Sequence, residues 1–509
     1  MLSPSRLLLL LTIAAVPAVY AAGVGSSATR PNIVIIYADD LGYGDVSCYG
    51  ATAIKTPHID RVAREGRRFT NAHATSATCT PSRFALLTGV YPWRRTDAKI
   101  LPGNAPALIT PEIGTAPAIL QQAGYTTAAV GKWHLGLGGE TLDWNTDIKP
   151  GPLEIGFNTC FLIPATGDRV PCVFVQDHRV VGLDPQDPIQ VSYSQPIGHD
   201  PTGKEHPELL KYKFSHGHDQ TIVNGISRIG YMSGGQRARW VDEDIADTLT
   251  RRATAFIEEN RRRPFFLYFA TQDIHVPRVP HSRFLGKSGL GRRGDAILQL
   301  DFCVGEVLGT LDRLGLAQNT IVIVSSDNGP VVDDGYHDGS VENLDGHLPA
   351  GPLRGGKYSA FEAGTRIPLI LRWPARVKPG VSDALVTQLD FFATFAALVG
   401  RKIPAKAGRD SRDGSAAFFG SDAKGRDFII EHAVNGRLGV RTAAWKYIEP
   451  GPGLAKNVNT NIELGNSTSP QLYDLKTDVG EKKNVAEQNP QVVEELKAML
   501  ASMRAPGTK

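Results

Sequence analysis

From residue 31 onward, short apolar runs alternate with stretches whose apolar residues recur every three or four positions. This alternation predicts an α/β fold, in which helices sandwich a large, mixed, mostly parallel sheet. The short runs are almost continuously apolar, as in strands that are buried on both faces. We expect strands at 32–37, 126–130, 265–270, 320–325 and 367–372.

Two of the stretches between these runs have a clear helical period, and each is followed by a strand, as a crossover connection requires. They cover residues 241–259 and 297–314. Apolar side chains line one face of each predicted helix: Val241, Ile245, Leu249 and Phe256 in the first, and Leu300, Val304, Val307, Leu311 and Leu314 in the second.

The pattern breaks in three places, which suggests how the chain is divided. Residues 138–240 and 331–356 are rich in Gly and polar residues and predict long loops, which are often functional. After about residue 401 the predicted strands become short, and a helix is expected at 491–503. We expect a catalytic domain at 30–405 with a substrate-loop insertion at about 176–240, and a smaller C-terminal α+β domain, an antiparallel sheet plus a helix, at 406–509.

The first 22 residues are typical of a cleaved secretory signal peptide. Arg6 precedes an apolar stretch too short to span a bilayer, and Val19 and Ala21 occupy the small-residue positions that a signal peptidase recognises. No cysteine follows at once, which argues against a lipid anchor. Because no later run approaches about 18 apolar residues, we expect no membrane span after cleavage. The exported protein would be periplasmic or secreted, or lysosomal in a eukaryote.

Composition narrows the class of protein further. A chain of 509 residues that is 41% hydrophobic and 21% charged should be globular. Its 55 basic and 52 acidic side chains give a net charge of only +3, too little for a nucleic-acid partner that is bound through phosphate contacts. The five cysteines are an odd number, so at least one is unpaired.

Chemically reactive side chains follow several of the predicted strands. Asp39 and Asp40 follow the first strand, and Asp327 and Asn328 follow the strand at 320–325. Taken alone, such a pair before a glycine is most often a turn signal. Because the carboxyl ends of parallel strands meet at one edge of a sheet, these oxygen ligands are expected to converge there. Hard oxygen donors favour Ca²⁺, with Mg²⁺ possible, over zinc.

Basic side chains follow two further strands at the same predicted edge. Lys132 and His134 come after the strand at 126–130, and His275 follows the strand at 265–270. A lone histidine is more often structural than catalytic. Four such strand ends together favour a site where the basic groups face an anion held by the metal.

The segment 79–89 reads C-T-P-S-R-F-A-L-L-T-G and is expected to begin a helix, because Pro81 suits a first turn. The exposed amides of such a turn attract anions, and a cysteine there could be a reactive thiolate. The segment matches the sulfatase signature C-x-P-S-R-x-x-L-L-T-G at every fixed position. A second sulfatase signature is complete at 124–136, which reads G-Y-T-T-A-A-V-G-K-W-H-L-G.

The chain therefore resembles the type I, formylglycine-dependent sulfatases, of arylsulfatase and N-acetylgalactosamine-6-sulfatase type. The likeness covers roughly 30–400, and the segments 472–475 and 480–481 resemble the family's C-terminal domain. It is weaker in the insertion and in 331–356. The resemblance implies the alkaline-phosphatase-like fold and a sulfuric ester hydrolase that acts on sulfate monoesters, with sulfated carbohydrate favoured and aryl sulfates also accepted.

The resemblance also implies what individual residues do. Cys79 would be oxidised to formylglycine (3-oxoalanine) by a formylglycine-generating or equivalent sulfatase-maturating enzyme, and its hydrate would attack the sulfur. His134 would be the general base that releases sulfate. Arg83 and Lys132 would hold the nucleophile, while Lys357 and His275 would bind sulfate oxygens, with His275 also a candidate acid. Further roles carried over are metal binding by Asp39, Asp40, Cys79, Asp327 and Asn328, and a contact of Thr166, where many relatives have Ser, with nucleophile or sulfate.

Two alternative functions stay open at this point. One is a formylglycine-dependent phosphonate or phosphodiester hydrolase; phosphatases of this fold usually carry two zinc ions and a Ser or Thr nucleophile. The other is an unmodified, non-catalytic protein that binds sulfated glycans.

The substrate is less well defined by the sequence. Residues 203–240 mix histidine, arginine and tryptophan, which suits an anionic sugar but equally a solvated loop. His216 and His218 resemble a metal tract, yet no further ligand has the right spacing, so a second metal site is not expected. Export and the long loops favour a sulfated glycan over a small aryl sulfate.

Overall fold

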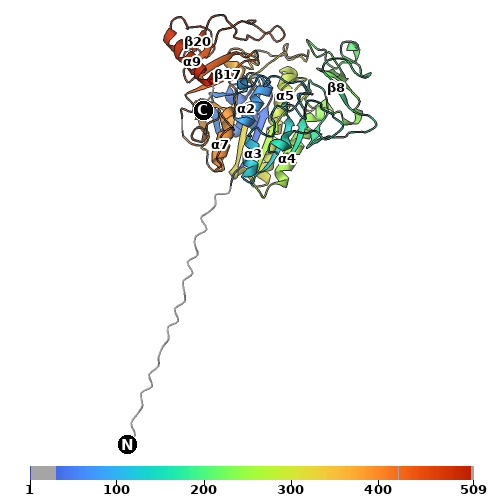
Figure 1. The fold of residues 1–509 in the computed structure, drawn as a ribbon, viewed down its shortest axis with the longest axis horizontal. Coiled ribbons are helices and arrows are strands. Elements are labelled where there is room, and N and C mark those ends of the chain that lie inside the picture. The colour runs from blue at the N-terminus through green and yellow to red at the C-terminus, as the bar shows by residue number, and fades with distance from the viewer. Residues whose placement is uncertain (2–29, 422, 506–509) are drawn as a thin grey trace.

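The computed structural model describes residues 1, 30–421 and 423–505 (Figure 1), so the predicted signal peptide lies outside the described residues. A ten-stranded sheet forms the centre of the fold. Its order is β15-β2-β14-β13-β1-β12-β4-β5-β6-β7. The strands are β15 Gly380–Ser382, β2 Arg67–Phe69, β14 Leu369–Arg372, β13 Thr320–Ser326, β1 Asn32–Ala38, β12 Phe265–Ala270, β4 Thr126–Lys132, β5 Thr159–Ile163, β6 Val175–Gln176 and β7 Arg179–Val180.

The middle of this sheet is parallel, and its three central strands are fully buried. Strands β13, β1, β12, β4 and β5 run in one direction, whereas β14, next to β13, and β6, next to β5, are antiparallel to their neighbours. Every residue of β1, β12 and β13 is buried. The prediction of a large, mixed, mostly parallel sheet is confirmed.

Helices cover both faces of the sheet (Figure 1). Helices α1 and α4 pack on α5, while α2 and α3 pack against α7. The helices are α1 Pro57–Glu65, α2 Cys79–Thr88, α3 Ala116–Gln122, α4 Ile245–Glu259, α5 Gly291–Arg313, α6 Glu362–Thr365, α7 Phe391–Leu398, α8 Ser415–Phe418 and α9 Pro490–Arg504. Within the described residues, no helix is long and apolar enough to cross a membrane.

A second, four-stranded antiparallel sheet follows at the C-terminal end and carries α9. Its strands are β17 Phe428–His432, β18 Leu438–Thr442, β19 Trp445–Ile448 and β20 Gln471–Asp474. It confirms the expected smaller α+β unit. Three further strand pairs lie outside both sheets: β3 Ala72–His73 with β16 Val386–Thr387, β8 Gln190–Ser192 with β11 Tyr231–Ser233, and β9 Ile222–Val223 with β10 Ile226–Ser227.

Three details of the predicted elements were wrong. Val241 is not on the buried face of α4, because a 3-10 turn at Asp242–Asp244 precedes the helix and leaves Val241 half exposed. Helix α5 begins at Gly291, six residues before the apolar period starts. Strand β5 lies within the stretch assigned to loops, because its short apolar run, 160–163, is surrounded by sequence rich in Gly, Pro and polar residues.

Candidate active site

The ends of four adjacent parallel strands bring the predicted site residues together. Tyr37 in β1 is in register with Ser325 in β13 and with Ala270 in β12, and Ala270 is in register with Gly131 in β4. The residues that follow these positions therefore emerge at one level of the sheet. They are Asp39 and Asp40, Asp327 and Asn328, Lys132 and His134, and His275.

Cys79 is the first residue of α2 and is almost fully buried at the same place. Its Sγ lies 3.3 Å from Nδ1 of His134. The other ring nitrogen of His134, Nε2, lies 2.9 Å from the carbonyl oxygen of Leu101, which can only accept a hydrogen bond. The proton of a neutral His134 is therefore on Nε2, and the lone pair of Nδ1 faces Cys79.

Burial, reinforced by the nearby cations Lys132 and Arg169, lowers the pKa of His134 well below its usual value. Thr80 donates a hydrogen bond to the backbone carbonyl of His134 at 2.8 Å and helps to hold this residue beside the helix start. A buried, neutral imidazole with its free nitrogen aimed at residue 79 is suited to accept a proton there.

Three buried carboxylates each have a cationic partner. Arg83 donates through Nε and Nη2 to Asp327 Oδ2, at 2.9 and 2.7 Å. Lys132 donates to Asp39, and Lys357 lies 2.9 Å from Asp40. These contacts offset the negative charge that would otherwise be isolated inside the protein.

Two oxygen atoms in this cluster still lack hydrogen-bond partners. Asp39 Oδ1 and Asn328 Oδ1 are buried and unpaired, although the amide of Asn328 donates to Asp40 Oδ1 at 2.7 Å. Burial also raises the pKa of Asp39 and of Asp40, despite the lysine beside each. Unpaired buried acceptors are costly, and a hard cation would satisfy them. The four predicted oxygen ligands therefore fit Ca²⁺ or Mg²⁺.

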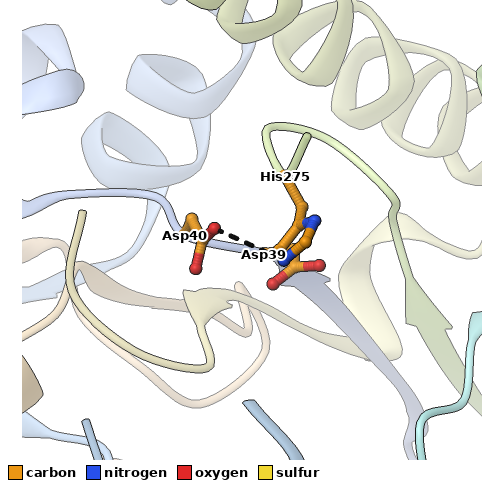
Figure 2. A group of neighbouring side chains, drawn as sticks. All are labelled: Asp39, Asp40 and His275. Carbon is orange, nitrogen blue, oxygen red and sulfur yellow. Dashed lines mark ion pairs between the residues drawn. The ribbon is translucent and has the colours of Figure 1, made fainter. Parts of the chain in front are cut away.

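Figure 2 shows Asp39 and Asp40 at the end of β1, with the ring of His275 reaching toward them from the loop after β12. His275 Nε2 lies 3.9 Å from a carboxylate oxygen of Asp40 and 3.9 Å from one of Asp334. Its Nδ1 donates to the Val276 carbonyl at 2.7 Å. Burial and the two nearby lysines lower the pKa of His275 well below its usual value, so an acid role requires substrate binding to raise that pKa.

Asp334 and Tyr358 also belong to the site, although neither was predicted. Asp334 accepts from Lys357 at 2.8 Å and from the hydroxyl of Tyr358 at 2.9 Å, so it holds both side chains. An aspartate in the Gly-rich stretch 331–356 looks like an ordinary turn residue in sequence. The only signal was the length of that loop.

Thr166 is fully buried, and its hydroxyl contacts Asp168 rather than Cys79 in the described structure. Asp168 in turn pairs with Arg169 at 2.8 Å and with Nε2 of His218 at 3.0 Å. Although burial alone would raise it, Arg169 and His275 hold the pKa of Asp168 well below its usual value. Asp168 and Arg169 were missed, and His218 was noticed as part of a possible metal tract and of the basic stretch 203–240 that could suit an anionic sugar.

The insertion at 176–240 places some of its basic residues away from the site. Arg228 is fully buried and pairs with Asp242 at 2.8 Å, which is a structural role. Arg239 pairs with Asp200 at 3.0 Å, and Trp240 is buried. All five cysteines, Cys79 among them, are free thiols.

Comparison with known proteins places the chain in a family. Residues 31–401 match the Sulfatase family model, and residues 356–506 match the model for the C-terminal part of N-sulphoglucosamine sulphohydrolase. An N-acetylgalactosamine-6-O-sulfatase of Bacteroides thetaiotaomicron is 56% identical over 482 residues, 94% of each chain. Human arylsulfatase A is 32% identical over 491 residues, 93% of this chain and 87% of its own.

Solved structures agree with the sequence comparison. One from B. thetaiotaomicron, described in connection with the metabolism of multiple glycosaminoglycans, has a TM-score of 0.93 and 56% identity, covering 94% of this chain and 99% of its own. A sulfatase from Pseudoalteromonas sp., 24% identical, shares the fold with a TM-score of 0.68 and covers 94% and 92% of the two chains. The chain belongs to the sulfatase family and is a sulfuric ester hydrolase.

Proposed function

We propose that this sulfatase removes sulfate esters from sugars of a sulfated glycan, with a formylglycine made from Cys79 as nucleophile. The observation that carries the proposal is the position of Cys79 Sγ, 3.3 Å from the free nitrogen of His134 and close enough to Lys132 and Lys357 for both cations to act on its pKa. Cations arranged in advance around a reacting anion stabilise charge that develops in the transition state.

The unmodified thiol is poorly suited to act as the nucleophile itself. Burial raises the pKa of Cys79 above its usual value, even though Lys132 and Lys357 lie nearby. At neutral pH the thiol is therefore protonated, whereas catalytic cysteines react as thiolates. This favours conversion of Cys79 over direct thiol chemistry, and we propose a formylglycine-generating or equivalent maturating enzyme as a partner.

The residues of the chain then have distinct roles in attack on sulfur, proton transfer and sulfate binding. The formylglycine hydrate supplies one hydroxyl for attack on sulfur and a second whose deprotonation releases sulfate. His134 accepts the proton at Nδ1 while Leu101 holds Nε2. Lys132, Lys357 and His275 bind the sulfate oxygens, and Arg83 is fixed by Asp327 beside the nucleophile. Once substrate binding raises the pKa of His275 so that Nε2 carries a proton, His275 donates that proton to the departing alcohol oxygen.

We propose that Asp39, Asp40, Asp327 and Asn328, together with modified residue 79, hold Ca²⁺, with Mg²⁺ as an alternative. Such an ion, when bound, would supply Lewis-acid stabilisation of the charge that develops at the reacting oxygens. Chelation should therefore abolish activity, Ca²⁺ or Mg²⁺ should restore it, and Zn²⁺ should restore it poorly, since the ligands are hard oxygens. Elemental analysis of active enzyme should find one such ion, and two stoichiometric zinc ions would contradict the assignment.

The substrate proposal is supported by the polar groups beside the sulfate-binding side chains. Asp168, Arg169 and His218 form a paired polar set that influences the pKa of groups in the site. Arg169 contributes to lowering the pKa of His134, Asp168 acts to raise that of His275, and His218 contributes to lowering that of Asp334. Such groups suit the hydroxyls of a sugar. The similarity to an N-acetylgalactosamine-6-O-sulfatase favours a 6-sulfated N-acetylhexosamine.

Asp168→Asn should lower kcat/KM for sugar sulfates by about 10- to 100-fold, the usual effect of losing a hydrogen bond to a charged group. The same change should alter hydrolysis of an aryl sulfate by less than about threefold, since that substrate lacks sugar hydroxyls. Steady-state kinetics on both substrates test this, with Glu140→Gln, an exposed carboxyl outside the site, as the control. Equal losses on the two substrates would indicate a purely structural role.

The direct test of the substrate proposal is a screen of sulfate release. Purified, matured enzyme is incubated with N-acetylgalactosamine and N-acetylglucosamine sulfated at O3, O4 or O6, where available as sugars and as oligosaccharides. We expect fastest release from O6 of N-acetylgalactosamine. Release from aryl sulfates alone would contradict a glycan substrate.

We also propose that the protein is exported to the periplasm or medium.

A further inference from the structure

A cavity of about 540 Å³ lies between the start of α2, the loop at 93–100 and the C-terminal sheet. This volume is within the range of small-molecule sites, about 300–1,000 Å³. Thr78 and Pro81, which flank Cys79 in the chain, form part of its wall, and His432 of β17 forms another part. The backbone amide of Ala77 donates to the carbonyl of His432 at 2.8 Å, so the two walls are joined (Figure 1 shows β17 beside α2).

The charged side chains that line this cavity are all cationic. They are Arg95, Lys99 and Arg504, and no aspartate or glutamate of the described chain lines it. Arg95 pairs with Asp97 and Arg504 with Glu449, whereas Lys99 is exposed and makes no ion pair with any residue that the structure describes. His432 adds no charge, since burial lowers its pKa to about 4. The cavity is therefore suited to an anionic ligand.

The remaining lining is both polar and apolar, as a sugar ring requires. Thr78 and Thr96 supply hydroxyls, while Ile100 and Leu438 supply apolar surface. The same loop also reaches the catalytic base, because Leu101, directly after Ile100, accepts the hydrogen bond from His134 Nε2. A ligand in the cavity would thus lie beside the nucleophile helix and next to the residue that orients His134.

We propose that this cavity is a second sugar subsite, which binds an acidic sugar next to the sulfated one in the same glycan chain. The acidic group is a carboxylate or a sulfate, and Lys99 is its principal partner. The inference rests on the proposed glycan sulfatase function. It assigns part of the substrate specificity to the C-terminal sheet and α9, outside the catalytic residues.

The test compares two substrates, an O6-sulfated N-acetylgalactosamine monosaccharide and disaccharides in which a uronic acid is joined to it on either side. Lys99→Glu should lower kcat/KM for the favoured disaccharide about tenfold, the scale of one charge-assisted hydrogen bond. The same substitution should change kcat/KM for the monosaccharide by less than about twofold. Thr96→Trp, which fills the cavity from an exposed position, should cause the same selective loss. Lys378→Glu is the matched control, an identical charge change at an exposed lysine outside the cavity.

Two further arms identify the anion. A disaccharide whose uronic carboxyl is reduced to an alcohol should lose the dependence on Lys99 if the carboxylate is bound. A disaccharide that carries a sulfate in place of the uronic carboxyl should keep the dependence on Lys99 if either anion is accepted. Equal effects of Lys99→Glu and Thr96→Trp on monosaccharide and disaccharide, or no effect on either, would overturn the subsite. Failure of the wild-type enzyme to release sulfate from the monosaccharide and from both disaccharides would instead contradict the proposed function itself.

Discussion

Cys79→Ser should abolish multiple turnover, lowering steady-state kcat by roughly 10⁴-fold or more, as removal of an essential nucleophile does. A serine hydroxyl can accept one sulfuryl group, but it has no second hydroxyl whose deprotonation would expel sulfate. The variant should still bind sulfate esters, because Arg83, Lys132 and Lys357 are unchanged. Rapid-quench assays should find at most one equivalent of alcohol released per enzyme.

The matched control is Cys303→Ser. Cys303 is also a buried free thiol, but it lies in α5, and the groups that shift its pKa include none of the proposed site residues. This variant should retain multiple turnover. Steady turnover by Cys79→Ser at more than a few per cent of the wild-type rate would contradict the assigned role of residue 79.

His134→Ala should release one equivalent of alcohol in a burst and then stall with sulfate retained by the protein. The reason is that His134 faces residue 79 through Nδ1, whereas no contact places it at the leaving group. We expect steady-state kcat to fall by about 10²- to 10⁴-fold, the usual contribution of a general base. Stopped-flow release of alcohol, compared with the amount of sulfate set free, measures both phases.

His275→Ala should behave differently, because His275 lies on the other side of the reacting sulfur in the proposed mechanism. Its loss should slow the first step, most for sugar sulfates and least for activated aryl sulfates, since a good leaving group needs little protonation. His178→Ala serves as a control, because His178 is partly exposed and pairs with Glu154. Equal losses on both substrate types for His275→Ala, without a burst for His134→Ala, would show that the two roles are assigned wrongly.

The strands that build the site could be predicted because each is a run of apolar residues buried on both faces. The start of α5 could not be predicted in this way. Its first turn contains Arg293 and Asp295, which are buried through ion pairs and hydrogen bonds rather than through apolar contact. Arg293 pairs with Asp45, far away in the chain, at 2.5 Å. Hydrophobic periodicity does not detect a helical turn that is buried in this way.

The site residues that were predicted have a local signal in the sequence, whereas those that were missed depend on contacts between distant segments. The reactive residues that follow strands were identifiable, because position at a strand end fixes where a side chain emerges. The pairing of Lys357 with Asp334 was not, because both lie on long irregular segments whose approach depends on the whole fold. Asp168, which precedes the insertion, and His218, which lies within it, come together for a similar reason, and neither has a sequence signature that distinguishes it from a loop residue.

The central claim, that residue 79 acts as a formylglycine, is tested most directly by mass spectrometry of the peptide that contains Cys79, taken from fully active enzyme. Conversion of the CH₂SH group to an aldehyde should lower the peptide mass by about 18 Da, and the modified fraction should equal the active fraction found by burst titration. A fully active preparation in which Cys79 is an unmodified thiol would contradict the account.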